Sequence, residues 1–377
     1  MRKRFFVPGG RCVFAPSFSI KGVRQLLCLS LLGIGLMVGS VSAQERSLTD
    51  RLEVPSRLSE KAGEGLLTAL SVAGQRVIAA GQRGHILWSD DGGHSWHQAQ
   101  VPVSSDLTAL QFVGERLGWA VGHDGVILHT QDAGATWRLQ LDGHRIAELL
   151  RAQAARMDRD LNPRALLDLE QAASQGLNQS LLALHFLDAN DGYALGAGGL
   201  LLRTRDGGQN WQSVSDQIEN PRGLHLYGMQ QAFGRLFIVG EQGLILRQAL
   251  NGEAFEKVQS PYQGSWFGAL GDADSLLVYG LMGNAWITRD SGASWQQSQL
   301  DSALALTSAS TANGKDLVMV SLGGEVFRSA DGGRHFQSQD IEQRYPFFAV
   351  AATANAGLVL AGIHGVRSVT SKSGVQP

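Results

Sequence analysis

The chain has 377 residues, of which 44% are apolar, and it contains 47 glycines against nine prolines. This composition supports a large core and many tight turns between short strands. The formal net charge of −2 excludes the strongly basic surface that is typical of nucleic-acid-binding proteins.

Residues 1–43 have the features of a secretory signal peptide. The start is basic, an apolar run follows over 26–41, and small residues at 41–43 suit a signal peptidase. An uncleaved membrane anchor is the alternative, but the run is short for a spanning helix and carries three glycines. Cys28 stands at the start of the run and not at its end, which disfavours a lipoprotein. We predict cleavage near Ala43 and a periplasmic or otherwise exported protein.

Both cysteines, Cys12 and Cys28, lie inside this segment. The mature chain is therefore expected to have no disulfide and no thiolate for a metal or a substrate. Loss of the six basic residues of the segment leaves 26 Lys and Arg against 34 Asp and Glu, a net charge of −8. Such a charge favours solubility and disfavours binding to anionic lipid or nucleic acid.

An octet with the pattern Ser/Thr-x-Asp-x-Gly-x-x-aromatic recurs five times in the rest of the chain. Its copies occupy 89–96, 130–137, 204–211, 288–295 and 329–336. The paired acidic and aromatic residues are Asp91 and Trp96, Asp132 and Trp137, Asp206 and Trp211, Asp290 and Trp295, and Asp331 and Phe336. A sixth, degenerate site at 251–255 keeps the turn and the aromatic residue but lacks this aspartate.

A second signature, a Gly-rich turn followed by a short apolar run, marks seven units. The anchoring glycines are spaced by 40–44 residues, with one interval of 74, and they are Gly84, Gly125, Gly199, Gly243, Gly283, Gly324 and Gly365. Each unit holds four short strands separated by turns, which is the pattern of one propeller blade. Because a blade cannot bury both faces alone, the repeats predict an all-β, seven-bladed β-propeller over residues 44–377.

The last unit predicts how the ring closes. It begins near Phe347 and supplies only three strands. We therefore expect Leu52-Glu53-Val54 to pair as its outer, fourth strand, because closure by an N-terminal strand removes an exposed edge.

The long interval contains an insertion of a different character, over residues 142–178. Apolar residues recur at helical spacing from Ile146 to Met157 and again from Leu166 to Ala173, with Asn162-Pro163 as a helix start between them. This predicts a helical hairpin that joins the second and third blades. It is either a lid packed on the blades or an element that docks a partner.

The octets allow two interpretations, a catalytic aspartate with a binding tryptophan, or a structural turn. The pattern resembles the Asp-box, or BNR, repeat, which occurs between the third and fourth strands of propeller blades. The resemblance implies that the five aspartates form turns on the face away from any ligand and that the aromatic residues pack between blades. We favour this structural role, because an active site is rarely copied five times around a ring.

The turns of the opposite face carry the side chains that we predict to bind a ligand around the channel mouth. These candidates are Arg83, His123, Asp124, Arg222, His225, Glu241, Gln242, Trp266 and His364. Solvated turns are the alternative for each, and Trp266 and Phe347 are equally compatible with the core. No catalytic motif is present, His123 and His364 are far apart in sequence, and we expect no metal and no cofactor.

The export signal, the seven units, the octets and the GxxG turns together resemble the photosystem II stability and assembly factor family over about residues 48–370. The resemblance implies a lumenal or periplasmic propeller that assists assembly of photosystem II, without known catalysis. The family also has members in non-photosynthetic bacteria, for which an exporter of the RND type is one hypothesis for the partner. This chain departs from the photosynthetic pattern by its insertion and by the lack of a dense arginine patch.

We predict an exported, non-catalytic scaffold that binds a membrane protein complex or exporter, without nucleic acid and without spanning the membrane itself. The alternative is an Asp-box glycoside hydrolase of the sialidase type. That chemistry needs an arginine cluster and two carboxylates across a cleft, and only Asp124 and Glu241 stand at the channel mouth. A purely structural or adhesive module is the third possibility, but the chain has no long Ser/Thr-rich tail.

Overall fold

The computed structural model describes residues 50–157, 163–250, 252–312, 314–353 and 357–369. The chain separates into two units, Met1–Ser47 and Leu48–Pro377, and the described residues belong to the second. The signal segment with its two cysteines and Asn162 lie outside the described residues.

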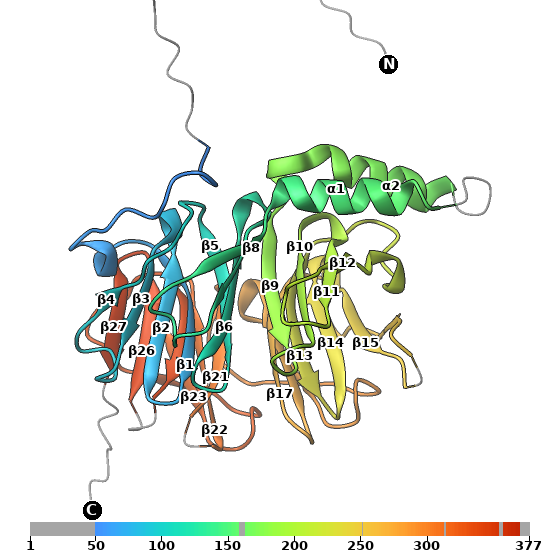
Figure 1. The fold of residues 1–377 in the computed structure, drawn as a ribbon. Helices are drawn as coiled ribbons and strands as arrows, with labels where there is room; N and C mark the ends of the chain where they lie inside the picture. The colour runs from blue at the N-terminus through green and yellow to red at the C-terminus, as the bar shows by residue number, and fades with distance from the viewer. Residues whose placement is uncertain (1–49, 158–162, 251, 313, 354–356, 370–377) are drawn as a thin grey trace, which may run out of the picture. The chain divides into compact units, whose positions relative to one another are not determined.

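The second unit consists of seven antiparallel sheets that follow one another along the chain (Figure 1). Blade 1 has β1 (Leu67–Ala73), β2 (Arg76–Gly81), β3 (Ile86–Ser89) and β4 (His97–Gln98). Blade 2 has β5 (Leu107–Val113), β6 (Leu117–Gly122), β7 (Ile127–Thr130) and β8 (Arg138–Leu141). Blade 3 has β9 (Leu181–Phe186), β10 (Gly192–Gly196), β11 (Leu201–Thr204) and β12 (Gln212–Ser213).

The remaining blades repeat this order. Blade 4 has β13 (Leu226–Ala232), β14 (Arg235–Gly240), β15 (Ile245–Gln248) and β16 (Phe255–Lys257). Blade 5 has β17 (Trp266–Gly271), β18 (Leu276–Gly280), β19 (Ala285–Thr288) and β20 (Gln296–Gln297). Blade 6 has β21 (Leu306–Ala312), β22 (Asp316–Ser321), β23 (Val326–Ser329) and β24 (Gln337–Gln339). Blade 7 has β25 (Phe347–Ala352), β26 (Leu358–Gly362) and β27 (Gly365–Val369).

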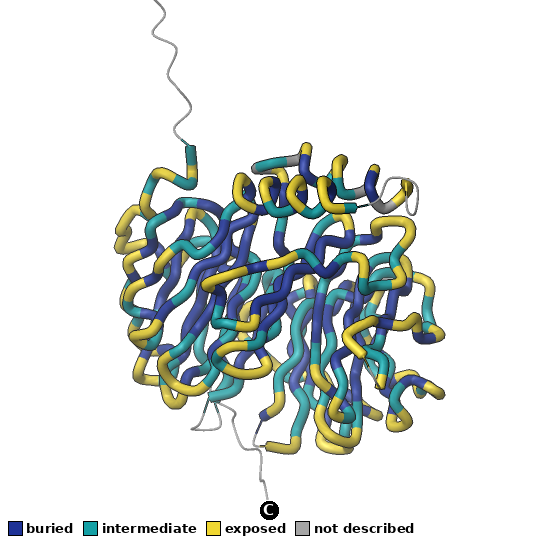
Figure 2. Tube along the Cα trace, turned by 45° about the vertical axis from the view of Figure 1, so that its right-hand side comes forward, coloured by how far each residue is buried: buried dark blue, intermediate teal, exposed yellow. Residues whose placement is uncertain are grey.

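Apolar side chains fill the space between neighbouring blades. Each of the seven buried clusters draws its residues from two adjacent blades, and the seventh joins blade 7 to blade 1. Between blades 2 and 3, for example, the rings of Trp119 and Phe186 stack with centroids 3.7 Å apart. The strands are accordingly buried along most of their length, while the turns are exposed (Figure 2). The predicted seven-bladed propeller is confirmed.

The predicted closure by an N-terminal strand is wrong. Blade 7 has three strands in the described part of the chain, and Leu52 to Val54 form a turn. The Asp50 carboxylate accepts a hydrogen bond from the Leu52 N–H (3.0 Å), and the Asp50 carbonyl accepts one from the Glu53 N–H (3.0 Å). Leu52 then packs against the core between blades 1 and 2. The local turn at Asp50 and the packing of Leu52 are thus favoured over pairing of this segment as a strand.

Antiparallel pairing gives the ring two distinct faces. One face carries the turns between second and third strands together with the links between blades, and we call it the upper face. The lower face carries the turns between first and second strands and the octets.

The predicted helical hairpin is confirmed and covers part of the upper face (Figure 1). It consists of α1 (Gly143–Ala154) and α2 (Pro163–Gln175), followed by a short 3-10 turn, and it joins β8 to β9. Asp142 caps α1 by accepting a hydrogen bond from the Arg145 N–H (2.9 Å). Ile146 and Leu150 are buried in the core between blades 2 and 3. The hairpin is therefore packed on the ring along this apolar side of α1.

Candidate binding face

The octets on the lower face are closed by their own hydrogen bonds, as blade 5 illustrates. The buried Thr288 hydroxyl donates to Asp290 Oδ1 (2.8 Å) and accepts from the Gly292 N–H (2.9 Å). The Asp290 carboxylate also accepts from the Ser294 N–H (2.8 Å) and the Ser294 hydroxyl (2.5 Å). These bonds, that of the Ser294 hydroxyl above all, lower the pKa of Asp290 to about 2. The carboxylate is thus committed to its turn.

The other four octets repeat this arrangement. Their hydroxyl groups are buried and accept from the octet glycine, at Ser89, Thr130, Thr204 and Ser329. The aromatic residues pack in the cores between blades: Trp96, Trp137, Trp211, Trp295 and Phe336. The five aspartates stand on five separate blades, so they do not converge on one cleft.

The turns of the upper face are tight and lie directly against the links between blades. In blade 5, Gly283 has a φ of +68°, and a Cβ there would lie 1.9 Å from the carbonyl oxygen of Ser302 in the next link. Gly365 of blade 7 is equally close to Gly63. The anchoring glycine recurs because no other residue leaves room for the link.

Four of the predicted binding residues come together where blade 3 leads into blade 4. Arg222 Nη1 donates to Gln242 Oε1 (2.8 Å), and the His225 N–H donates to Glu241 Oε2 (3.1 Å). The His225 ring also lies 3.4 Å from that carboxylate, measured from Nδ1 to Oε2. Tyr227 continues the cluster toward the channel, and burial together with the charge of Glu241 raises its pKa. This cluster combines hydrogen-bonding groups with an aromatic surface.

The other candidates are separate from this cluster. Asp124 accepts from the Ser105 hydroxyl (2.7 Å), and His123 Nδ1 lies 2.9 Å from Ser180 Oγ, so both side chains secure links. Arg83 is exposed, and the exposed His364 lies edge-on to Tyr345. The ligand-binding role of these residues stays a prediction.

The placement of Trp266 at the binding site is wrong. Its side chain has no exposed surface, and its indole Nε1 donates to the Ser260 hydroxyl (3.1 Å) inside the core between blades 4 and 5. Phe347 is likewise buried, between blades 6 and 7. Both are the first residues of innermost strands, where the side chain turns toward the neighbouring blade and not toward the channel.

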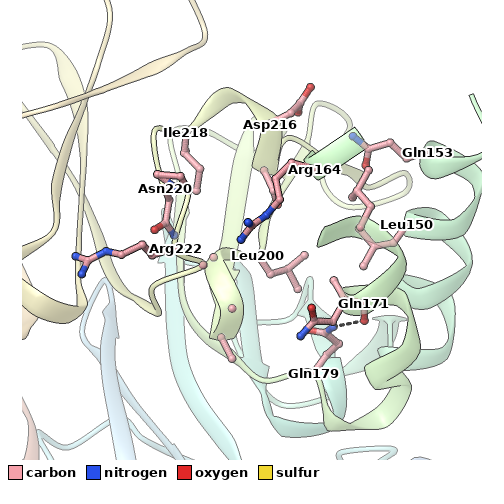
Figure 3. A pocket seen from close by; sticks show the side chains of 18 of the residues that line it. Leu150, Gln153, Arg164, Gln171, Gln179, Leu200, Asp216, Ile218, Asn220 and Arg222 are labelled. Atoms are coloured by element: carbon pink, nitrogen blue, oxygen red, sulfur yellow. Dashed lines mark hydrogen bonds between the residues drawn. The ribbon is translucent and has the colours of Figure 1, made fainter. Parts of the chain in front are cut away.

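A cleft of about 420 Å³ lies between the helical hairpin and the link from blade 3 to blade 4. Its apolar lining includes Leu150 and Leu200, and the Arg164 side chain points into it from α2 (Figure 3). Gln153 Oε1 is buried there and has no hydrogen-bond partner among the described residues. Sequence reasoning missed this cleft, because it joins helix residues to link residues about 50 positions away.

Exposed large apolar side chains form what we call the apolar arc, on the upper face of blades 5 to 7. Its members are Leu281, Met282, Leu304, Leu322 and Ile363, exposed by between 38% and 66%. Leu304, in the link from blade 5 to blade 6, lies beside the turn that carries Leu322, since a Cβ on Gly323 would lie 2.8 Å from Leu304 Cδ1. Large apolar side chains that gather on one exposed face of a protein mark a candidate site of interaction. The upper face therefore has a polar half with the hairpin and an apolar half.

The described residues offer neither a cluster of metal-ligating side chains nor a helix that could span a membrane. No three His, Cys, Asp or Glu side chains lie close enough together there to hold a metal ion. None of the helices in that part of the chain is both long and apolar enough to cross a membrane.

Seven blades, octets closed on themselves on one face and a varied opposite face define an Asp-box β-propeller with one candidate binding face. The family described as "Photosynthesis system II assembly factor YCF48" matches residues 69–147 and 170–342, and the chain belongs to this family. The match omits residues 148–169, which make up most of the helical hairpin.

Individual relatives agree with this assignment. The chloroplastic photosystem II stability/assembly factor HCF136 of Oryza sativa subsp. japonica is 33% identical over 63 residues, 15% of each chain. The photosystem II assembly lipoprotein Ycf48 of a Synechococcus strain is 24% identical over 176 residues, 46% of this chain and 51% of the relative. The chain thus spans about half, or less, of the length of these curated relatives. A solved structure of YCF48 bound to D1 peptide shares the fold, with a TM-score of 0.58 and 16% identity over 85% of this chain and 98% of that one.

Proposed function

We propose that the chain is an exported, non-catalytic scaffold that binds a membrane protein complex through its upper face and acts as an accessory or assembly factor for it. Membership of the YCF48 family supports the proposal, as does the solved relative that holds a D1 peptide. Export is supported by the signal features of residues 1–43. The name of the Synechococcus relative, a lipoprotein, agrees with a place beside a membrane.

The apolar arc is the observation that carries this proposal. Leu281, Met282 and Leu304 are exposed although their side chains are among those that water disfavours most. The octets of the lower face, by contrast, leave their aspartates bonded to their own turns. A partner that covers the arc removes apolar surface from water, and the neighbouring Arg222–Gln242 cluster supplies polar groups that orient it.

No observation favours the glycosidase alternative. Asp124 and Glu241 each accept hydrogen bonds from neighbouring turns and links, and they stand on different blades. In the described part of the chain, each carboxyl group with a shifted pKa has a pKa below its ordinary value, as in Asp91 and Glu256. A catalytic acid of a glycosidase needs a raised pKa.

The test is affinity capture from detergent-solubilised membranes with the mature protein as bait. Met282→Glu and Leu304→Glu place charges in the apolar arc. The matched controls are Leu187→Glu and Leu250→Glu, which change leucines on the lower face whose exposures, 38% and 81%, bracket the 66% of Met282 and the 51% of Leu304. We expect the arc variants to reduce recovery of one integral-membrane complex at least about fivefold and the controls to leave it unchanged. Equal recovery with all four variants, or recovery of no membrane protein, refutes the proposal.

A further inference from the structure

In the described part of the chain, no strand pairs with the outer edge of blade 7. In the other six blades the third strand pairs outward with a fourth, whereas β27 pairs with β26 alone among the described strands. Ala361 pairs with Val366 as Ala80 pairs with Ile86 in blade 1, where the Ile86 carbonyl accepts from the Ala99 N–H (2.8 Å). By this register the main-chain groups of Val366 and Ser368 point outward, at the place where a fourth strand pairs in the other blades.

Blade 1 forms the second wall of the same slot. Between blades 1 and 2, the Trp137 N–H donates to the Gln100 carbonyl (3.0 Å), and the Gln100 N–H donates to the Ala135 carbonyl (3.0 Å). The same pair of bonds joins blades 5 and 6. Trp96 and His94 hold these positions opposite blade 7, and their main-chain N–H and carbonyl have no such partner among the described residues. The main-chain N–H groups of Trp211 and Trp295 lack this bond as well, although blades 2 and 4 have a fourth strand, so β27 is the edge that marks the missing strand among the described residues.

A groove of about 660 Å³ lies at the upper end of the slot, between Val366 of β27, blade 1 and the segment 58–63, and its apolar lining includes Leu58, Leu87 and Trp96. The equivalent segment of blade 1 shows what such a slot accepts. There Ala99 and Val101 are buried, while Gln100 between them is exposed. The fitting occupant is a short extended segment with small or branched apolar side chains at alternate positions.

We propose that this slot binds a β-strand of a partner protein, which completes blade 7 by strand addition. The described residues that precede Ala62, from Asp50 onward, take another path, because the Ser56 N–H donates to the Val101 carbonyl (3.0 Å) beside blade 1. Leu58, which is exposed by 68%, lines the groove together with Val366 and adds apolar surface at the upper end of the slot. The inference rests on the proposed function in one respect, that the strand belongs to the bound partner.

The test separates the edge N–H of Ser368 from its side chain. Ser368→Pro removes the outward donor and is compatible with an edge strand, while Ser368→Ala keeps the donor. The probe is a fluorescein-labelled peptide with the sequence of residues 96–101, which occupies the equivalent place in blade 1, and binding to the mature full chain is followed by anisotropy. We expect Ser368→Pro to weaken binding about three- to tenfold, the effect of one main-chain hydrogen bond, and Ser368→Ala to change it less than twofold.

A second measurement covers the case in which proline disturbs β27 itself. A photo-crosslinking amino acid at Leu58 should attach to the peptide, and the same amino acid at Leu187 on the lower face should not. Absence of binding, equal affinity of both Ser368 variants, or slow amide exchange of Trp96 and Ser368 in the chain alone overturns the inference. Met282→Glu should leave peptide binding intact, so a failure of the proposed function is seen separately from a failure of strand addition.

Discussion

Thr288→Val tests whether the octets hold the ring together through their buried hydroxyl groups. The change keeps the size of the side chain but removes the hydroxyl oxygen, which accepts two hydrogen bonds. The donors of these bonds are the buried Gly292 N–H and the part-buried Asp290 N–H. A buried donor left without a partner costs about 1–3 kcal/mol. With a smaller contribution from Asp290, we expect the free energy of unfolding to fall by about 2–3 kcal/mol.

Thr288→Ser is the matched control, because Ser89 and Ser329 fill the same position in other octets. It keeps the hydroxyl and loses one methyl group, which costs no more than about 1 kcal/mol. Urea unfolding followed by tryptophan fluorescence measures both variants against the parent chain. If the valine variant is as stable as the serine variant, the hydroxyl is not what closes the turn, and the structural role of the octets is refuted.

Two further predictions concern single positions. The folded-state pKa of Asp290, about 2, lies below its ordinary value of 3.8, so its contribution to stability is present above about pH 4 and is lost as the pH falls toward 2. Urea midpoints of the parent chain at pH 6, 4 and 3 should therefore fall more steeply than those of Asp290→Asn, and parallel curves would contradict the assignment. Gly283→Ala should cost at least about 2 kcal/mol, because the new Cβ meets the Ser302 carbonyl oxygen, whereas Gly314→Ala, at the same φ of +68° but in open space, should cost about 1 kcal/mol. Equal urea midpoints for these two glycine variants would contradict the prediction, because they would show that the link at Ser302 moves away from the new Cβ without loss of stability.

The number of blades and the place of the hairpin were predictable because they rest on local chemistry that repeats. An octet such as 288–295 closes its turn with hydrogen bonds among its own eight residues, so its sequence alone specifies the turn. The helices likewise begin at local signals: Pro163, part of the predicted helix start, begins α2, and Asp142 caps α1. Repetition then fixes the ring, because each unit buries its side chains only against a copy of itself.

Long-range choices were not predictable in this way. Leu52 to Val54 has the composition of a short strand and was expected to pair with the edge of blade 7. The Asp50 turn directs this segment elsewhere, and Leu52 packs against the core between blades 1 and 2. The prediction for Trp266 was wrong because successive side chains of an innermost strand face opposite sides. A shift of one residue therefore moves a side chain from the channel to the core. The apolar arc and the cleft combine links with turns or helices, and no motif in the sequence connects those segments.

The anchoring glycines explain why the ring tolerates both an insertion and a missing strand. A Cβ on Gly125 would lie 2.7 Å from the Gly143 backbone nitrogen, so the helical hairpin keeps the turn-to-link contact at its first residue and departs only afterwards. At blade 7 the segment before β1 makes that contact through Gly63, although the described residues supply no fourth strand there. The contact between a link and the anchoring glycine is thus kept at blades that differ in their links and outer strands. The upper face can vary, and blade 7 can keep an edge open for a partner, without loss of closure.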